Sequence, residues 1–94
     1  MADGRLAGQI ALVTGASSGI GRAIALGYAR AGADVIVHYR TRTAEAEAVA
    51  DAIRALGQRA QVVRGDIASA AEVAAFMVEA EALGPITIAV CNAG

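Results

Sequence analysis

Hydrophobic residues along the chain follow two alternating spacings, one typical of buried strands and one typical of helices. Four short apolar runs bounded by polar residues or glycine have strand character; they are residues 9–13, 35–37, 60–63 and 86–91. Between these runs, apolar residues recur every three or four positions, which predicts helices. The first predicted helix ends at Gly32, and its apolar face consists of Ile20, Ala23, Ile24, Gly27 and Ala31.

Two further helices are predicted from the same spacing. The second begins near Thr43, the predicted N-cap, and ends at Gly57. Its apolar face consists of Ala46, Val49, Ala50, Ile53 and Leu56. The third opens on Ser69 and Glu72, which have the spacing of a capping box, and is broken at Gly84-Pro85. Its apolar face consists of Val73, Phe76, Met77, Ala80 and Leu83.

The strictly alternating order of strands and helices predicts an α/β fold with one doubly wound parallel sheet. With right-handed crossovers, and with the first two running outward in the usual way, the four strands, numbered along the chain, take the spatial order 3-2-1-4. We expect residues 1–94 to form a single, truncated domain whose fourth strand is a fully buried apolar run. That strand would have an unpaired outer edge, which predicts pairing with a second copy or with a missing carboxyl-terminal half.

Composition narrows the class of partner. Hydrophobic residues make up 56% of the chain but aromatic residues only 3%, as expected for thin layers of small aliphatic side chains. The net charge is −1 without a basic tract, so neither nucleic acid nor an anionic membrane is an expected partner. No apolar run approaches the roughly 18 residues needed to span a bilayer, and residues 1–9 are too polar for a signal peptide. We therefore expect a cytoplasmic protein that binds a small molecule.

Cysteine and lysine usage exclude several chemistries. The single cysteine, Cys91, rules out an internal disulfide and a cysteine-built metal cluster, and we expect it to be a small buried hydrophobe. All eight basic residues are arginine, and the chain has no lysine.

A glycine-rich turn between the first strand and the first helix predicts a phosphate site. It reads Thr14-Gly15-Ala16-Ser17-Ser18-Gly19-Ile20-Gly21. A strand that feeds such a turn and then a helix directs backbone N–H groups and the positive end of the helix dipole at one point. Gly15 would permit the sharp turn, Gly19 the approach of a pyrophosphate, and Gly21 the close packing of the helix.

The same turn also fits the Gly-x-Ser-x-Gly pattern of the hydrolase nucleophile elbow. That alternative would require a triad formed with His38, the sole histidine, and with Asp34. Both lie on the adjacent strand without the long excursions that a triad needs, and five-residue patterns are permissive. The hydrolase interpretation is therefore disfavoured.

Three motifs in the right order resemble those of the short-chain dehydrogenase/reductase family. They are the glycine-rich turn, Asp66-Ile67 after the third strand, and the final Asn92-Ala93-Gly94. The resemblance covers nearly the whole chain but only the front, Rossmann-type half of that family's fold. Among the members, the chain resembles the 3-oxoacyl-carrier-protein reductases.

The resemblance implies a role for each motif in binding a dinucleotide. Contacts to the pyrophosphate and the nearby ribose are implied for Gly15, Ser17, Ser18, Gly19, Ile20 and Gly21. Asp66 and the Ile67 amide would bind the adenine edge, and Asn92, Ala93 and Gly94 would line the floor beside the ribose. Asp66 alone would fit equally well as a turn or cap residue before Ser69.

The end of the second strand decides between NADP and NAD. NAD-binding sites carry a carboxylate there for the ribose 2′-hydroxyl, but this chain has Tyr39 at that position. Arg40 and Arg42, on either side of Thr41, could instead bind a 2′-phosphate through charge-assisted hydrogen bonds of about 1.5–3 kcal/mol each. NADP is therefore predicted, with NAD as the alternative, because NADP-using relatives often carry a basic residue where this chain has Ser18, and the two arginines could simply be solvated.

The catalytic residues that the family uses are not found in this sequence. Members reduce carbonyls with a tyrosine, a lysine four residues later that lowers the tyrosine pKa, and a serine. Neither Tyr28 nor Tyr39 begins such a pattern. No catalytic residue and no metal ligand is assigned. The sequence predicts the NADP(H)-binding half of an oxidoreductase acting on CH–OH groups; the alternative is a dinucleotide-binding module or self-pairing fragment without turnover.

Overall fold

Four parallel strands form one sheet in the computed structural model, which describes residues 4–92. The strands are β1 (Ile10–Val13), β2 (Asp34–Tyr39), β3 (Ala60–Arg64) and β4 (Ile88–Val90). They alternate with α1 (Gly19–Arg30), α2 (Thr43–Ala55) and α3 (Ala70–Ala80), and a short 3₁₀ helix, η1 (Glu81–Leu83), follows α3. The order β3-β2-β1-β4 confirms the predicted topology.

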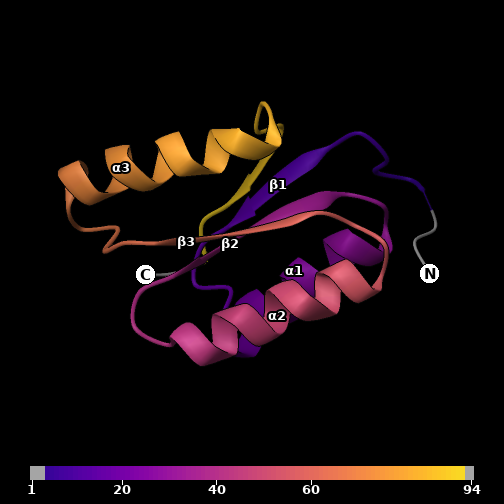
Figure 1. The fold of residues 1–94 in the computed structure, drawn as a ribbon, viewed down its shortest axis with the longest axis horizontal. Coiled ribbons are helices and arrows are strands. Elements are labelled where there is room, and N and C mark those ends of the chain that lie inside the picture. Colours follow the sequence, from indigo (N-terminus) through magenta and orange to yellow (C-terminus); the bar gives the residue numbers. More distant parts are fainter. Residues whose placement is uncertain (1–3, 93–94) are drawn as a thin grey trace.

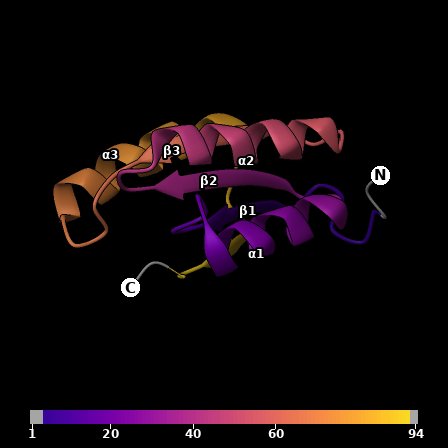
Figure 2. The ribbon, with the colours of Figure 1, turned by 90° about the horizontal axis from the view of Figure 1, so that it is seen from below.

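The helices cover both faces of the sheet. Helices α1 and α2 lie side by side on one face, and α3 lies on the other (Figures 1 and 2). Along β2, Val35, Val37 and Tyr39 pack into the layer under α1 and α2, whereas Ile36 packs with Phe76 of α3. This alternation of faces explains why a central strand of a doubly covered sheet is apolar at successive positions.

The carboxyl ends of all four strands meet at one edge of the sheet. In the parallel register, Val13 of β1 lies beside Val37 of β2 and Val90 of β4, and His38 of β2 lies beside Val63 of β3. The crossovers run in opposite directions on the two sides of β1, so the gap between β1 and β4 is the topological switch point. The glycine-rich turn leaves β1 at that gap.

The apolar face predicted for α1 is partly wrong. The residues buried against the sheet are Gly21, Ala25 and Ala29, whereas Ile20 is 73% exposed and Ala23 and Gly27 are also exposed. The first turn of α1 lies so close to the preceding turn that only the smallest side chains fit toward the sheet. This approach turns the i, i+4 series of glycine and alanine inward.

Helices α2 and α3 bury the predicted faces, but their N-termini differ in detail. Arg42, not Thr43, is the N-cap of α2, because its carbonyl accepts from the Ala46 amide at 3.0 Å; the Thr43 hydroxyl instead donates to the Tyr39 hydroxyl at 3.3 Å. At α3, the Ser69 hydroxyl accepts from the Glu72 amide at 3.2 Å, as the capping box predicts. The Glu72 carboxylate does not return to the Ser69 amide; it accepts from the Asp66 amide at 3.0 Å.

The fourth strand is shorter and more exposed than predicted. None of Ile88, Ala89 and Val90 is buried, and Cys91 is exposed rather than buried. The physical reason is position, because β4 ends the sheet and, among residues 4–92, is hydrogen-bonded as a strand to β1 alone. No helix in this part of the chain is long and apolar enough to cross a membrane.

Candidate functional site

The glycine-rich turn adopts backbone conformations that require glycine at two positions. Gly15 has a φ of 64° and Gly19 a φ of 60°, both in the left-handed region that other residues rarely adopt. Gly21 is required for a different reason. A Cβ at that position would collide with the Gly15 carbonyl oxygen and would lie 2.6 Å from the Asn92 Nδ2 atom.

Hydrogen bonds from neighbouring strands hold the start of this turn in place. The Gly15 amide donates to the His38 Nδ1 atom at 3.1 Å, and the Ala16 amide donates to the His38 carbonyl at 2.9 Å. On the other side, the Asn92 side-chain amide donates to the Gly15 carbonyl at 3.3 Å. The Asn92 backbone amide donates to the Thr14 hydroxyl at 2.9 Å. The turn is therefore tied to both β2 and the end of β4.

The amino end of α1 is open to an external anion. Ser18 is the N-cap with an extended φ of −156°, and its hydroxyl makes no capping hydrogen bond. No acidic residue lies in the first helical turn, and Ser18, Gly19 and Ile20 are exposed. The positive end of the helix dipole and its first amides can therefore be satisfied by a bound anion.

A hollow of about 270 Å³ lies beside this helix end, on the side of α2. Its wall includes Ser17, Ser18 and Gly19 of the turn, together with Arg22 of α1 and Glu45 of α2. The Arg42 guanidinium lies 4.0 Å from the Glu45 carboxylate, and both side chains are exposed. The hollow thus joins the phosphate-type turn to a charged surface at the start of α2.

The end of β2 presents its arginines to solvent and its tyrosine to the core. Tyr39 is only 8% exposed and packs in the layer under α1 and α2, so its side chain does not stand at the sheet edge. Arg40, Thr41 and Arg42 are exposed. The Arg40 guanidinium, 70% exposed, lies 3.4 Å from the Asp66 carboxylate at the end of β3.

The two carboxylate oxygens of Asp66 have different surroundings: one stabilises a turn and the other faces this edge of the sheet. One carboxylate oxygen, Oδ1, accepts from the Ala68 amide at 2.9 Å, which is the turn role that the sequence left open. The other oxygen, Oδ2, faces Arg40. The adjacent Ile67 is a large apolar residue that is 41% exposed. At this edge of the sheet, the Asp66 carboxylate could accept a hydrogen bond from the edge of a planar base, and the Ile67 side chain could pack against the face of that base.

The predicted segments therefore gather at the same edge of the sheet, with two qualifications. The turn, Arg40–Arg42, Asp66–Ile67 and Asn92 all follow strands at their carboxyl ends, whereas the Tyr39 side chain points into the core. Ala93 and Gly94 lie outside the described residues. Sequence reasoning missed the supporting roles of Thr14 and His38, although a polar residue next to or within a buried strand is a usable signal.

The nucleophile-elbow alternative has no geometric support. Both ring nitrogens of His38 lie within hydrogen-bond distance of backbone groups, namely the Gly15 amide and the Gly65 carbonyl, rather than a serine. Asp34 lies at the opposite end of β2, where its carboxylate accepts from the Gln58 side chain and from Arg59. The three members of a triad are therefore not brought together.

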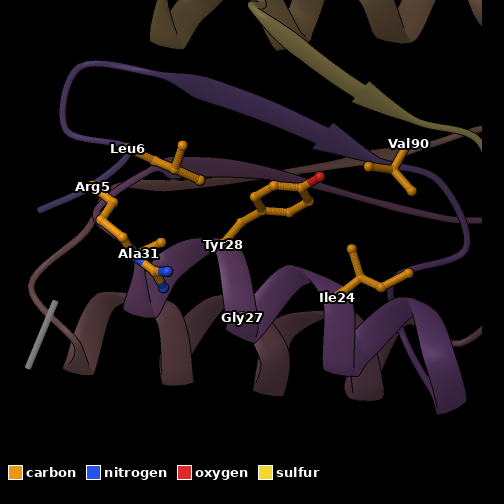
Figure 3. A pocket seen from close by; sticks show the side chains of 7 residues that line it. All are labelled: Arg5, Leu6, Ile24, Gly27, Tyr28, Ala31 and Val90. Atoms are coloured by element: carbon orange, nitrogen blue, oxygen red, sulfur yellow. The ribbon is translucent and has the colours of Figure 1, made fainter. Parts of the chain in front are cut away.

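A groove of about 500 Å³ lies away from the turn, between α1 and the strands (Figure 3). The Tyr28 ring extends along it, with Ile24 and Val90 toward one end and Arg5 and Leu6 toward the other. Its lining is largely apolar and includes the end strand β4, so this groove is a separate surface from the polar edge described above.

Comparison with known proteins agrees with the fold. Residues 9–94 match the family model described as short chain dehydrogenase. The chain is 50% identical over 84 residues to 3-oxoacyl-[acyl-carrier-protein] reductase FabG of Aggregatibacter actinomycetemcomitans, covering 88% of this chain and 35% of that protein. It is 46% identical over 90 residues to L-rhamnose 1-dehydrogenase (NAD(P)(+)) of a Sphingomonas species, covering 95% of this chain and 35% of that enzyme.

A solved structure shows the same similarity in three dimensions. A short chain dehydrogenase from Burkholderia cenocepacia J2315 in complex with NADP superimposes with a TM-score of 0.89 at 47% identity. The match covers 96% of this chain and 37% of that structure. The chain thus spans about a third of the length of the curated relatives it matches.

Proposed function

This chain belongs to the short-chain dehydrogenase family, and on that premise we propose that the turn at residues 14–21 binds the pyrophosphate of NADP(H). The observation that carries the proposal is the fastened turn at the switch point. Hydrogen bonds to His38 and Asn92 fix Gly15, while the amino end of α1 remains open to an anion. Such a preformed site binds a phosphate without first ordering its own backbone.

The charges at the edge fit NADP better than NAD. The exposed guanidinium of Arg40 is suited to a 2′-phosphate, and β2 ends without the carboxylate that would accept from a 2′-hydroxyl. Exposed ion pairs such as Arg40–Asp66 contribute only about 0–1 kcal/mol, so a 2′-phosphate can displace Asp66 as the partner of Arg40. Asp66 Oδ2 would then accept from the adenine amino group.

We propose that this chain binds the cofactor, and we assign no step of the hydride-transfer reaction to its residues. When bound, NADPH supplies the hydride for reducing a carbonyl, the reaction class of its 3-oxoacyl reductase relative. The described residues of this chain bind and orient the dinucleotide, and none is assigned to proton transfer. The assignment of residues 1–94 to one domain, the cytoplasmic location and the lack of independent turnover remain predictions.

Dissociation constants for NADP and NAD, measured by calorimetry, test the proposal. We expect NADP to bind about tenfold to a hundredfold more tightly, as one charge-assisted contact to the 2′-phosphate would give. Arg40→Ala should remove about tenfold of the NADP affinity while leaving NAD binding unchanged.

The matched control is Arg30→Ala, which removes an exposed arginine in the last turn of α1, far from the edge. It should leave both dissociation constants unchanged. Equal affinities for the two dinucleotides, or tighter NAD binding, would contradict the NADP assignment. A chain that binds neither dinucleotide would contradict the proposed function as a whole.

The free edge of β4 supports a second proposal, concerning partners. We propose that this edge, together with the apolar groove beside it, is covered in one of two ways. Either a second copy of this chain covers it, or a segment does that corresponds to the part of the longer relatives that this chain does not match. Two observations support this proposal. Ile88 and Val90 are partly exposed, and the lining of the groove is largely apolar.

A further inference from the structure

His38 is a buried polar residue that connects the glycine-rich turn with the segment that precedes Asp66. It is 1% exposed, on β2, and its ring centroid lies 4.8 Å from that of Phe76 on α3. The Nδ1 atom lies 3.1 Å from the Gly15 amide nitrogen, and the Nε2 atom lies 2.7 Å from the Gly65 carbonyl oxygen. One imidazole therefore spans from the start of the phosphate turn to the residue that precedes Asp66.

These two partners determine where the ring proton lies. The Gly15 amide can only donate, so Nδ1 must accept and cannot carry a proton; the Gly65 carbonyl can only accept, so Nε2 must carry one. The neutral Nε2–H tautomer alone satisfies both contacts. A second proton on Nδ1 would oppose the Gly15 amide directly.

The surroundings of Gly65 keep its carbonyl within reach of the ring. The Gly65 amide donates to the Tyr39 carbonyl at 3.1 Å. A Cβ on Gly65 would lie 2.6 Å from a ring carbon of Phe76, so the backbone presses against α3. His38 is therefore held on one side by this packed backbone and on the other supports Gly15, whose position sets the direction of the turn.

We propose that His38 is a positioning residue for the dinucleotide site, fixing the phosphate turn and the Asp66 segment relative to each other through its Nε2–H tautomer. The identity of the ligand, NADP(H), rests on the proposed function. His38 itself is buried and does not touch the cofactor. Its effect on affinity is indirect and acts through the Gly15 amide, a partly buried donor that would lose its acceptor.

Nitrogen NMR of the wild-type chain without ligand tests the tautomer directly. We expect a protonated Nε2, an unprotonated Nδ1, and a scalar coupling across the hydrogen bond between Nδ1 and the Gly15 amide. The Gly15 amide should also exchange slowly with solvent. A proton on Nδ1, or a rapidly exchanging Gly15 amide, would overturn the proposal whether or not NADP binds.

Two substitutions test the consequence for binding. His38→Phe keeps a ring beside Phe76 but has no acceptor, and it should weaken NADP binding about fivefold to tenfold, as loss of one partly buried hydrogen bond predicts. His38→Asn places a side-chain oxygen near the position of Nδ1, and it should keep the dissociation constant within about twofold of wild type. Ile36→Val, a neighbouring buried change on β2, is the control that should alter stability without altering affinity.

The outcomes separate this inference from the proposed function. Folded His38→Phe with wild-type affinity, or His38→Asn as weak as His38→Phe, would contradict the positioning role while leaving NADP binding intact. If the wild-type chain binds neither dinucleotide, the proposed function fails, and the nitrogen spectrum still decides the role of His38 in the turn. If His38→Phe does not fold, the asparagine variant and that spectrum carry the test.

Discussion

At the residue scale, the site depends on how closely two backbone segments approach each other. Gly21, in the first turn of α1, lies directly against the Gly15 carbonyl and the Asn92 side chain. The approach brings the amino end of the helix to the turn, which is what an anion site there requires. Gly27, six residues later on the same helix, has open space where a Cβ would stand.

This difference predicts opposite effects for the same substitution at two glycines of one helix. Gly21→Ala should destabilise the chain by about 3 kcal/mol, because the added methyl group must displace backbone, and NADP binding should be lost with it. Gly27→Ala should stabilise the chain by about 0.5–1 kcal/mol, because alanine restricts the unfolded chain and favours helix. Urea unfolding measures both effects. Equal stability of the two variants would contradict the packing argument.

Sequence reasoning predicted the glycines of the turn better than their supports. Glycine spacing after a strand has a local cause, so Gly15, Gly19 and Gly21 could be identified without a structure. The partners of His38 are backbone groups 23 and 27 residues away, and backbone groups leave no trace in the identity of a residue. For that reason the sole histidine could be considered only for a nucleophilic triad.

At the element scale, the helices differ in how their amino ends are satisfied. In α3 the Ser69 hydroxyl accepts from the Glu72 amide, whereas in α1 the N-cap hydroxyl of Ser18 makes no such bond. The closed end belongs to a helix that packs on the sheet as a support. The open end belongs to the helix that we propose binds pyrophosphate.

Serine-to-alanine changes at the two caps should separate support from site. Ser69→Ala should cost about 1 kcal/mol of stability, because one amide of α3 loses its acceptor. Ser18→Ala should change the stability of the ligand-free chain by less than about 0.5 kcal/mol, because no capping bond is lost. Thermal unfolding of both variants without dinucleotide gives the comparison. An equal loss at the two sites would contradict the distinction.

The faces of the helices could be predicted where packing on the sheet alone decides them. In α2, Ala46, Val49, Ala50 and Ile53 are buried as their spacing predicts. Helix α1 is different because its rotation is set by the contact of Gly21 with the turn, not by its largest apolar residues. Its apolar residues Ile24 and Tyr28 instead line the groove next to β4.

At the scale of the whole molecule, the strand order could be predicted and the burial of β4 could not. The order follows from right-handed crossovers, a local property of each strand–helix–strand unit, together with the usual outward direction of the first two. Burial depends on what lies beyond the strand. The apolar character of Ile88 to Val90 predicts full burial, yet at the end of the sheet Ile88 and Val90 are half-buried and Ala89 is exposed.

Self-association measured by size exclusion with light scattering tests the edge of β4. We expect the average mass to rise with concentration, because the unpaired strand edge and the apolar groove favour contact between chains. Ala89→Lys, at an exposed position in the middle of β4, should reduce that rise, whereas Ala74→Lys on the exposed side of α3 should not. A wild-type chain that stays monomeric at high concentration would argue against pairing between copies.

The tie between Asn92 and the Gly15 turn has a consequence for the order in which the protein acquires its parts during synthesis. The two residues are 77 positions apart, so the turn is fully fastened only after β4 has left the ribosome and joined β1. Until then the nascent chain would have the glycine motif without its final shape. We therefore expect the proposed binding of NADP to start only after Asn92 has emerged from the ribosome.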